Sequence, residues 1–204
     1  WRNSHGQVYI PEKNYIFAIG GSYAPLTCEY YEVAEDEWAS GPELTLGIKA
    51  GTACYTGSYV YYFGGLTRGD DEDAENFYRP ISYMERLNFA EFKAWEVVEV
   101  NIEGKAPMIS MYLGAGMIDE NTMLIFGGML ALEDGNTNGE DAEDAFFFDV
   151  NMQTFSEAPK MKRPIRMAHD EVKVINGKVY AVGEVSFEPI LSIYNIAEKK
   201  WNHK

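Results

Sequence analysis

Two Arg-x-x-His elements are the strongest candidates for chemistry in this 204-residue sequence. Arg2 precedes His5, and Arg166 precedes His169, with the same spacing. Such a pair could bind a carboxylate or a peptide turn, because a guanidinium offers parallel N–H donors and an imidazole titrates near neutral pH. The same side chains could instead hydrogen-bond the surrounding backbone, and we favour this structural interpretation.

Charged residues are concentrated in three segments. Of the 32 acidic residues, five lie in 67–77 and six in 132–146, and a basic segment follows at 159–166. The acidic segments could bind a protein partner that carries a basic patch, or they could stay solvated and be screened by the basic segment. The candidate partner-binding residues here are Asp70, Asp71, Asp73, Asp141, Asp144, Lys162 and Arg163.

Common signatures of catalysis and of cofactor binding are missing. The stretch GAGMID (114–119) lacks the third glycine of a dinucleotide-binding motif, and no GxSxG nucleophile motif occurs. The stretch DGNTNG (134–139) begins like a calcium loop, but its twelfth position is Ala145 instead of a glutamate. We therefore expect a non-enzymatic protein with no catalytic residue, no cofactor and no metal.

The composition of the chain limits the classes of partner and the cellular compartment that we expect. The formal net charge of −15 disfavours nucleic acid, because phosphates would be repelled. No apolar run is long enough to span a membrane. The only two cysteines, Cys28 and Cys54, lie in strand-like apolar runs far from any CxxC spacing, which favours buried free thiols and a cytoplasmic location.

An internal repeat organises the whole chain. The segments YIFAIGG, YVYYFGG and NTMLIFGG end at Gly20-Gly21, Gly64-Gly65 and Gly127-Gly128, and a fourth copy keeps Gly183 but has Glu184 at the second position. An aromatic strand follows, and a second aromatic residue comes seven positions later. The pairs are Tyr31 with Trp38, Phe148 with Phe155 and Tyr194 with Trp201, while the second unit departs, with Tyr83 and Trp95 twelve apart.

Each repeat is predicted to form four short antiparallel strands. Turn-forming stretches separate the first two strands of every unit, and the Asn-Gly at 176–177 is the strongest hairpin signal. Alternating β-branched and aromatic residues suit a pleated surface, and no amphipathic helix is evident. Because the second unit is irregular, we expect an insertion or bulge in its third or fourth strand.

Repeats of two hydrophobic strands, a diglycine, an aromatic residue and then a tryptophan resemble kelch repeats. This resemblance covers essentially the whole chain and implies an all-β fold, a β-propeller of four-stranded antiparallel blades. The four blades are expected at about 2–46, 47–104, 108–160 and 164–204. Since kelch propellers usually have more blades, we expect a part of a larger propeller; a four-bladed ring is the alternative.

The resemblance to kelch repeats also suggests functions. It implies a non-enzymatic protein–protein interaction module, such as a substrate receptor of a ubiquitin ligase or a cytoskeletal scaffold. The alternative is a carbohydrate-binding or sugar-processing propeller that uses Arg2, His5, Arg166 and His169 at the mouth of the central channel. A diglycine that bound phosphate would need a following helix N-terminus, so we interpret the glycines as structural.

Overall fold

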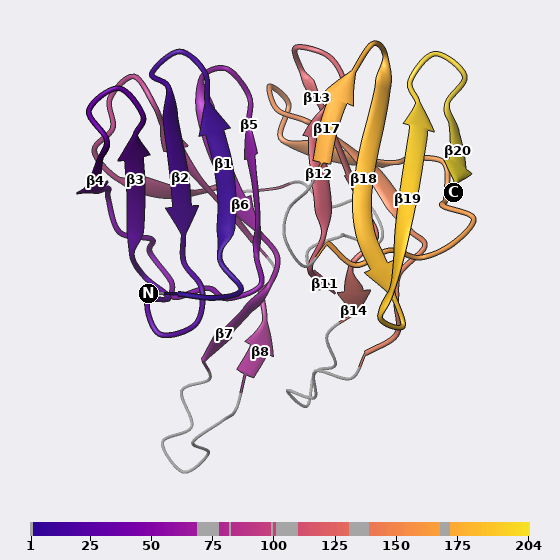
Figure 1. The fold of residues 1–204 in the computed structure, drawn as a ribbon, viewed down its shortest axis with the longest axis horizontal. Coiled ribbons are helices and arrows are strands. Elements are labelled where there is room, and N and C mark those ends of the chain that lie inside the picture. The colour runs from indigo at the N-terminus through magenta and orange to yellow at the C-terminus, as the bar shows by residue number, and fades with distance from the viewer. Residues whose placement is uncertain are drawn as a thin grey trace.

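The chain folds as a four-bladed β-propeller in a computed structural model (Figure 1). The structure describes residues 2–68, 78–81, 83–98, 100, 110–130, 139–167 and 172–204. Within these ranges the regular elements are strands, and none is a helix. Four antiparallel sheets of four strands each form the blades, which confirms the all-β propeller fold predicted from the repeats.

Every blade is an antiparallel meander whose first strand lies innermost, because the first strands of consecutive blades contact one another around the axis. The first blade contains β1 (Gly6–Ile10), β2 (Tyr15–Ile19), β3 (Cys28–Glu32) and β4 (Glu37–Ser40). The second contains β5 (Thr52–Tyr55), β6 (Tyr59–Phe63), β9 (Met84–Asn88) and β10 (Trp95–Val98). The third contains β12 (Gly114–Met117), β13 (Thr122–Phe126), β15 (Ala145–Asp149) and β16 (Thr154–Glu157). The fourth contains β17 (Val172–Ile175), β18 (Lys178–Val185), β19 (Glu188–Asn195) and β20 (Lys200–His203).

Two small sheets extend from the end of the propeller at which the diglycine turns lie, which we call the lower face (Figure 1). One sheet pairs β7 (Leu66–Arg68) with β8 (Tyr78–Pro80), and the other pairs β11 (Ser110–Met111) with β14 (Met129–Leu130). The first acidic segment (67–77) connects β7 to β8, and the second acidic segment (132–146) follows β14. These strands were not predicted from the sequence, because they are only two or three residues long.

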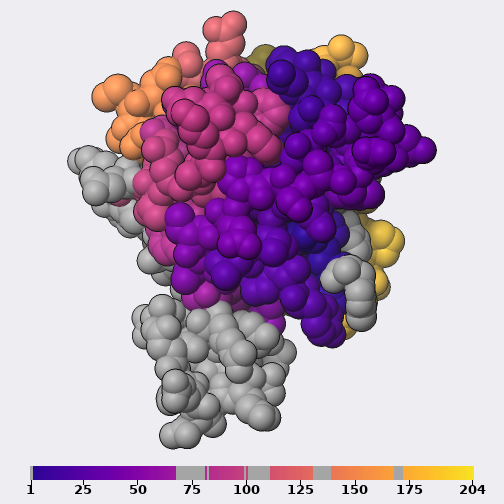
Figure 2. All heavy atoms as spheres, turned by 90° about the vertical axis from the view of Figure 1, so that its left-hand side faces the viewer, coloured from indigo at the N-terminus to yellow at the C-terminus, as the bar shows by residue number. Residues whose placement is uncertain are grey.

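The two sides of each sheet pack against different blades. In β13, Met123 and Ile125 belong to the core shared with the second blade, and Leu124 and Phe126 belong to the core shared with the fourth. We call these sides the preceding face and the following face. Since successive side chains of a strand point to opposite sides, one apolar strand serves both interfaces. Accordingly, atoms of the first and second blades form one continuous surface in Figure 2.

The diglycine turns of the first three blades lie beside the links between blades. All six glycines have positive φ, a backbone conformation that other residues rarely adopt. The N–H of Gly21 donates to the carbonyl oxygen of Ile48, and the N–H of Gly128 donates to that of Ile165, both at 2.7 Å. Ile48 and Ile165 belong to the links that lead into the next blade. The structural interpretation of the diglycines is therefore confirmed at these two turns.

The fourth blade has a different turn at this position. Gly183 and Glu184 continue β18, which forms an eight-residue ladder with β19. Ser186 and Phe187 close the hairpin with φ values of 51° and 65°. No link to a further blade docks here among the described residues.

The expected irregularity of the second blade is smaller than predicted. Trp95 pairs with Leu87 rather than with Tyr83, in the same register that joins Trp201 to Tyr194 in the fourth blade. The prediction that Tyr83 holds the aromatic position was wrong, because an aliphatic leucine fills this buried place. Leu87 and Trp95 are eight positions apart, whereas Tyr194 and Trp201 are seven apart, so the turn before Trp95 contains one additional residue.

Candidate protein-binding face

Arg2 holds the first blade together. Its guanidinium donates to the carbonyl oxygens of Gly20 (3.0 Å) and Thr27 (2.9 Å), to the Thr27 hydroxyl (3.0 Å), and to the carboxylate of Glu29 (2.5 Å). The Arg2 side chain is only 8% exposed. Most donors of the guanidinium are directed at the loop between β2 and β3, which supports the structural interpretation of this residue.

Arg166 and the neighbouring basic link pair with the second acidic segment. The Nε of Arg166 donates to the carboxylate of Asp141, and Lys160 lies 2.8 Å from the carboxylate of Asp144. The backbone of Arg166 also exchanges two hydrogen bonds with Glu184. The predicted proximity of acidic and basic segments is thus present at 140–144, where two of the four carboxylates pair with cations of the link.

Lys162 and Arg163 remain exposed at the end of this basic link. The backbone N–H of Lys162 donates to Nε2 of His203 (3.2 Å), and the other ring nitrogen of His203 contacts the Ser192 hydroxyl at 2.9 Å. Burial lowers the pKa of His203, and the nearby charges of Arg163 and Lys162 lower it further. His203 is therefore a structural residue of β20, one position before the last residue that the structure describes.

Several predicted site residues lie outside the described residues. They are Asp70, Asp71, Asp73 and His169, together with most of the calcium-like stretch 134–139. His5 is described and packs beneath the first diglycine, because a Cβ added to Gly21 would lie 2.9 Å from the Cβ of His5. The structure therefore places Arg2 and His5 in the first blade and Arg166 beside Asp141.

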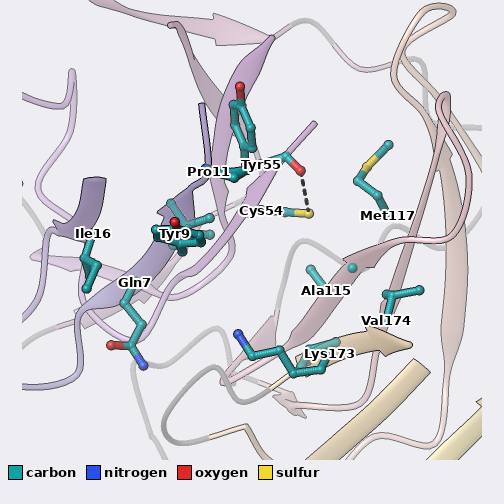
Figure 3. A pocket seen from close by; sticks show the side chains of 14 residues that line it. Gln7, Tyr9, Pro11, Ile16, Cys54, Tyr55, Ala115, Met117, Lys173 and Val174 are labelled. Carbon is teal, nitrogen blue, oxygen red and sulfur yellow. Dashed lines mark hydrogen bonds between the residues drawn. The ribbon is translucent and has the colours of Figure 1, made fainter. Parts of the chain in front are cut away.

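The axis of the propeller contains an open cavity of about 570 Å³. The innermost strands of all four blades line it, and Gln7 of the first blade and Lys173 of the fourth both project into it (Figure 3). The thiol of Cys54 also lies on this wall. Burial raises the pKa of the Cys54 thiol to about 12, so it stays protonated at neutral pH and is poorly suited as a nucleophile.

A second hollow, of about 400 Å³, opens on the lower face between the first two blades. We call it the lower hollow. Its rim carries Tyr23 and Leu26, whose side chains are 75% and 42% exposed, and its floor includes the buried Leu66 and Thr67. The complete lining is Gly21, Ser22, Tyr23, Pro25, Leu26, Gly47, Lys49, Leu66 and Thr67.

Backbone hydrogen bonds fix the segments that form the lower hollow. The N–H of Ile48 donates to the carbonyl oxygen of Pro25 (2.9 Å), and the N–H of Leu44 donates to that of Leu26 (2.8 Å). Lys49 and Leu66 exchange two hydrogen bonds of 2.9 Å. Little conformational freedom of the backbone would therefore be lost when a ligand binds.

Glu85 stabilises the same link from the side of the second blade. Its carboxylate is fully buried and accepts hydrogen bonds from the backbone N–H groups of Thr45 (2.8 Å) and Leu46 (3.2 Å). Burial raises the pKa of Glu85, and these hydrogen bonds counteract the increase. Glu85 and Tyr23 were not singled out from the sequence, because neither belongs to a motif and each acts with residues far away in the chain.

Among the described residues, no group of three or more His, Cys, Asp or Glu side chains could hold a metal ion. The described part of the chain also contains no helix long and apolar enough to cross a membrane. In comparisons with known proteins, no family model matches the chain, and no curated protein matches it either.

Proposed function

We propose that this chain is a non-enzymatic protein-binding module, a kelch-type propeller that recognises a partner with the lower hollow. The observation that carries the proposal is the combination of exposed Tyr23 and Leu26 with a backbone fixed by hydrogen bonds. An exposed tyrosine at the rim of a rigid, partly apolar hollow is a typical anchoring position for a protein ligand, and Leu26 adds apolar contact area beside it.

The charge of the neighbouring sequence suggests the chemistry of the partner. Strand β7 leads from the floor of the lower hollow directly into the acidic segment, in which five carboxylates follow Thr67 within eight residues. An apolar anchor flanked by Lys or Arg would suit both features, because the acidic segment attracts cations and the hollow accepts the apolar side chain.

The finer functional assignments follow from the resemblance to kelch repeats. They include a substrate receptor of a ubiquitin ligase and a cytoskeletal scaffold, both in the cytoplasm. Two buried free thiols agree with a reducing compartment. We do not place a sugar-binding site at the Arg-x-x-His elements, because the guanidinium groups of Arg2 and Arg166 bind other parts of the protein.

A displayed-peptide selection tests the proposal. Random peptides are selected on the immobilised protein, and the affinity of enriched peptides is then measured for the wild type, L26D and L130D. Leu130 is a matched control, because it is 39% exposed and also lies on the lower face, but in the small sheet of β11 and β14, away from the lower hollow. We expect peptides with an apolar residue beside Lys or Arg, and at least about tenfold weaker binding to L26D alone. Equal binding to L26D and the wild type would contradict the proposed site.

A further inference from the structure

The preceding face of the first blade carries an apolar row that no other blade covers among the described residues. Cross-strand pairing aligns Tyr9 with Ile16, Ile16 with Tyr31, and Tyr31 with Trp38. Tyr9, Ile16 and Trp38 are 49%, 40% and 61% exposed. The rings of Tyr31 and Trp38 also contact each other, with centroids 5.5 Å apart.

The outer three positions of this row are buried in every other blade, whereas the innermost position, held here by Tyr9, is occupied in the fourth blade by the 41% exposed Val174. The residues equivalent to Ile16 are all 0% exposed, and those equivalent to Trp38 are between 2% and 9% exposed. Strand register identifies the equivalents of Ile16 as Val60, Met123 and Val179, and those of Trp38 as Trp95, Phe155 and Trp201.

The two equivalent tryptophans also show which segments cover this face inside the chain. The indole N–H of Trp95 donates to the carbonyl oxygen of Pro42 (3.0 Å), in the link that leaves the preceding blade. Trp201 donates in the same way to Pro159 (2.8 Å). The face thus binds the following face of a blade together with the link that leaves that blade. For Trp38, the part of the chain that the structure describes provides no such link.

The fourth blade carries the complementary face, and it is uncovered too. Val182 is 52% exposed, whereas the residues at its position in the other blades, Ile19, Phe63 and Phe126, are all 0% exposed. Tyr180, Leu191 and Ile193 lie on this side and are partly exposed. Within the chain, a following face packs against a preceding face three times, between consecutive blades. The first blade leaves a preceding face uncovered and the fourth blade leaves a following face uncovered, so one chain presents both halves of this interface.

We propose that a second copy of this chain docks head to tail, with the following face of its fourth blade against the preceding face of the first blade. Charge supports this occupant. At the outer end of the row on the first blade, Asp36 accepts a hydrogen bond from the Tyr31 hydroxyl, and both Asp36 and the neighbouring Glu35 are exposed. The uncovered side of the fourth blade carries the exposed lysines Lys173, Lys178 and Lys200 beside its apolar residues.

Docking at both ends joins two copies into a ring of eight blades, within the range known for propellers. A contact between two different surfaces of the same chain either closes a ring or forms an open chain. Both arrangements use the same two faces, and they differ in the mass of the assembly.

Sedimentation velocity over a concentration series tests the proposal. We expect the wild type to associate to twice the chain mass of 23.1 kDa, or to a series of multiples of it. Both W38K and V182K should be monomers, with an association constant reduced at least about tenfold. M152K is the control, because Met152 is 71% exposed but lies in the turn between β15 and β16.

Mixing the two variants distinguishes this contact from a symmetric one. W38K keeps the intact face on its fourth blade, and V182K keeps the intact face on its first blade. An equimolar mixture should therefore form a dimer that neither variant forms alone. A wild type that stays monomeric at every concentration, or a mixture that stays monomeric while the wild type associates, would overturn the proposal.

Discussion

The indole N–H of Trp201 donates a hydrogen bond of 2.8 Å to the carbonyl oxygen of Pro159. Trp201 lies in the outermost strand of the fourth blade, and Pro159 lies in the link that leaves the third. The hydrogen bond therefore joins two consecutive blades at their periphery, while the first strands join them at the axis. The recurring tryptophan of the repeat is thus an element of blade-to-blade assembly.

Removing this hydrogen bond should destabilise the propeller. In W201F the ring is smaller and the Pro159 carbonyl loses its donor, so we expect the free energy of unfolding to fall by about 1–3 kcal/mol. Urea unfolding, followed by far-UV circular dichroism, measures the loss. W38F is the matched control at a concentration at which the chain is monomeric, and a change within about 0.5 kcal/mol is expected there. Equal losses in both variants would contradict the assigned role of the indole.

The diglycine turns should be sensitive to a single methyl group. Gly20 has a φ of 62°, and a Cβ added there would lie 2.4 Å from the carbonyl oxygen of Ile48. Gly177 has a similar φ of 72°, but a Cβ there would contact nothing within 4 Å. We expect backbone strain to lower the free energy of unfolding of G177A by about 1 kcal/mol. In G20A the free energy of unfolding should fall by about 1–3 kcal/mol more, because the new methyl group also meets the Ile48 carbonyl oxygen. Thermal or urea unfolding measures the stability of both variants. A similar fall in the free energy of unfolding of G20A and G177A would contradict the importance of the close approach at Gly20.

Arg2 should act on stability rather than on binding. R2M removes the donors of the carbonyl oxygens of Gly20 and Thr27 and leaves Glu29 without its cation, so we expect a loss of about 2–4 kcal/mol. R163M changes an exposed arginine in the same way and should alter the free energy of unfolding by less than about 0.5 kcal/mol. An R2M variant as stable as the wild type would refute the structural role of Arg2.

His203 should make the stability of the fourth blade depend on pH. Its pKa in the folded protein lies below the ordinary value of 6.5, so the unfolded chain takes up the proton first as the pH falls. The contribution of His203 is therefore complete above pH 6.5 and is lost between this value and the lowered pKa. Between about pH 7.5 and about pH 5.5, the free energy of unfolding should fall less in H203N than in the wild type. If the free energy of unfolding had the same pH dependence in H203N and in the wild type, His203 would not be responsible for that dependence.

The repeats made the sheet architecture predictable, but not the detailed contacts. The diglycines and the Asn-Gly turn mark places where local backbone chemistry decides the structure, and the strands were found between them. Leu87 was missed because a leucine fills the buried position as well as an aromatic residue does. The partners of Arg2 could not be predicted, because they are mostly backbone atoms up to 25 residues away.

The lower hollow was not predictable for a similar reason. Tyr23, Gly47 and Leu66 come from three separate segments, and none of these segments contains a binding motif. Only the folded chain brings them together. The charged residues near 140–144 were identified from the sequence, but their pairing with Lys160 and Arg166 depends on the path of the link into the fourth blade.

Site-specific photo-cross-linking tests the binding function most directly. A photoreactive phenylalanine derivative replaces Tyr23 in one variant and Met152, an exposed residue on the opposite end of the propeller, in another. In an extract of the cells that make the protein, we expect a discrete cross-linked partner from position 23 and none from position 152. Excess unlabelled wild type should suppress this product, whereas excess L26D should not. The same products from both positions, or equal suppression by both competitors, would contradict a partner-binding site at the lower hollow.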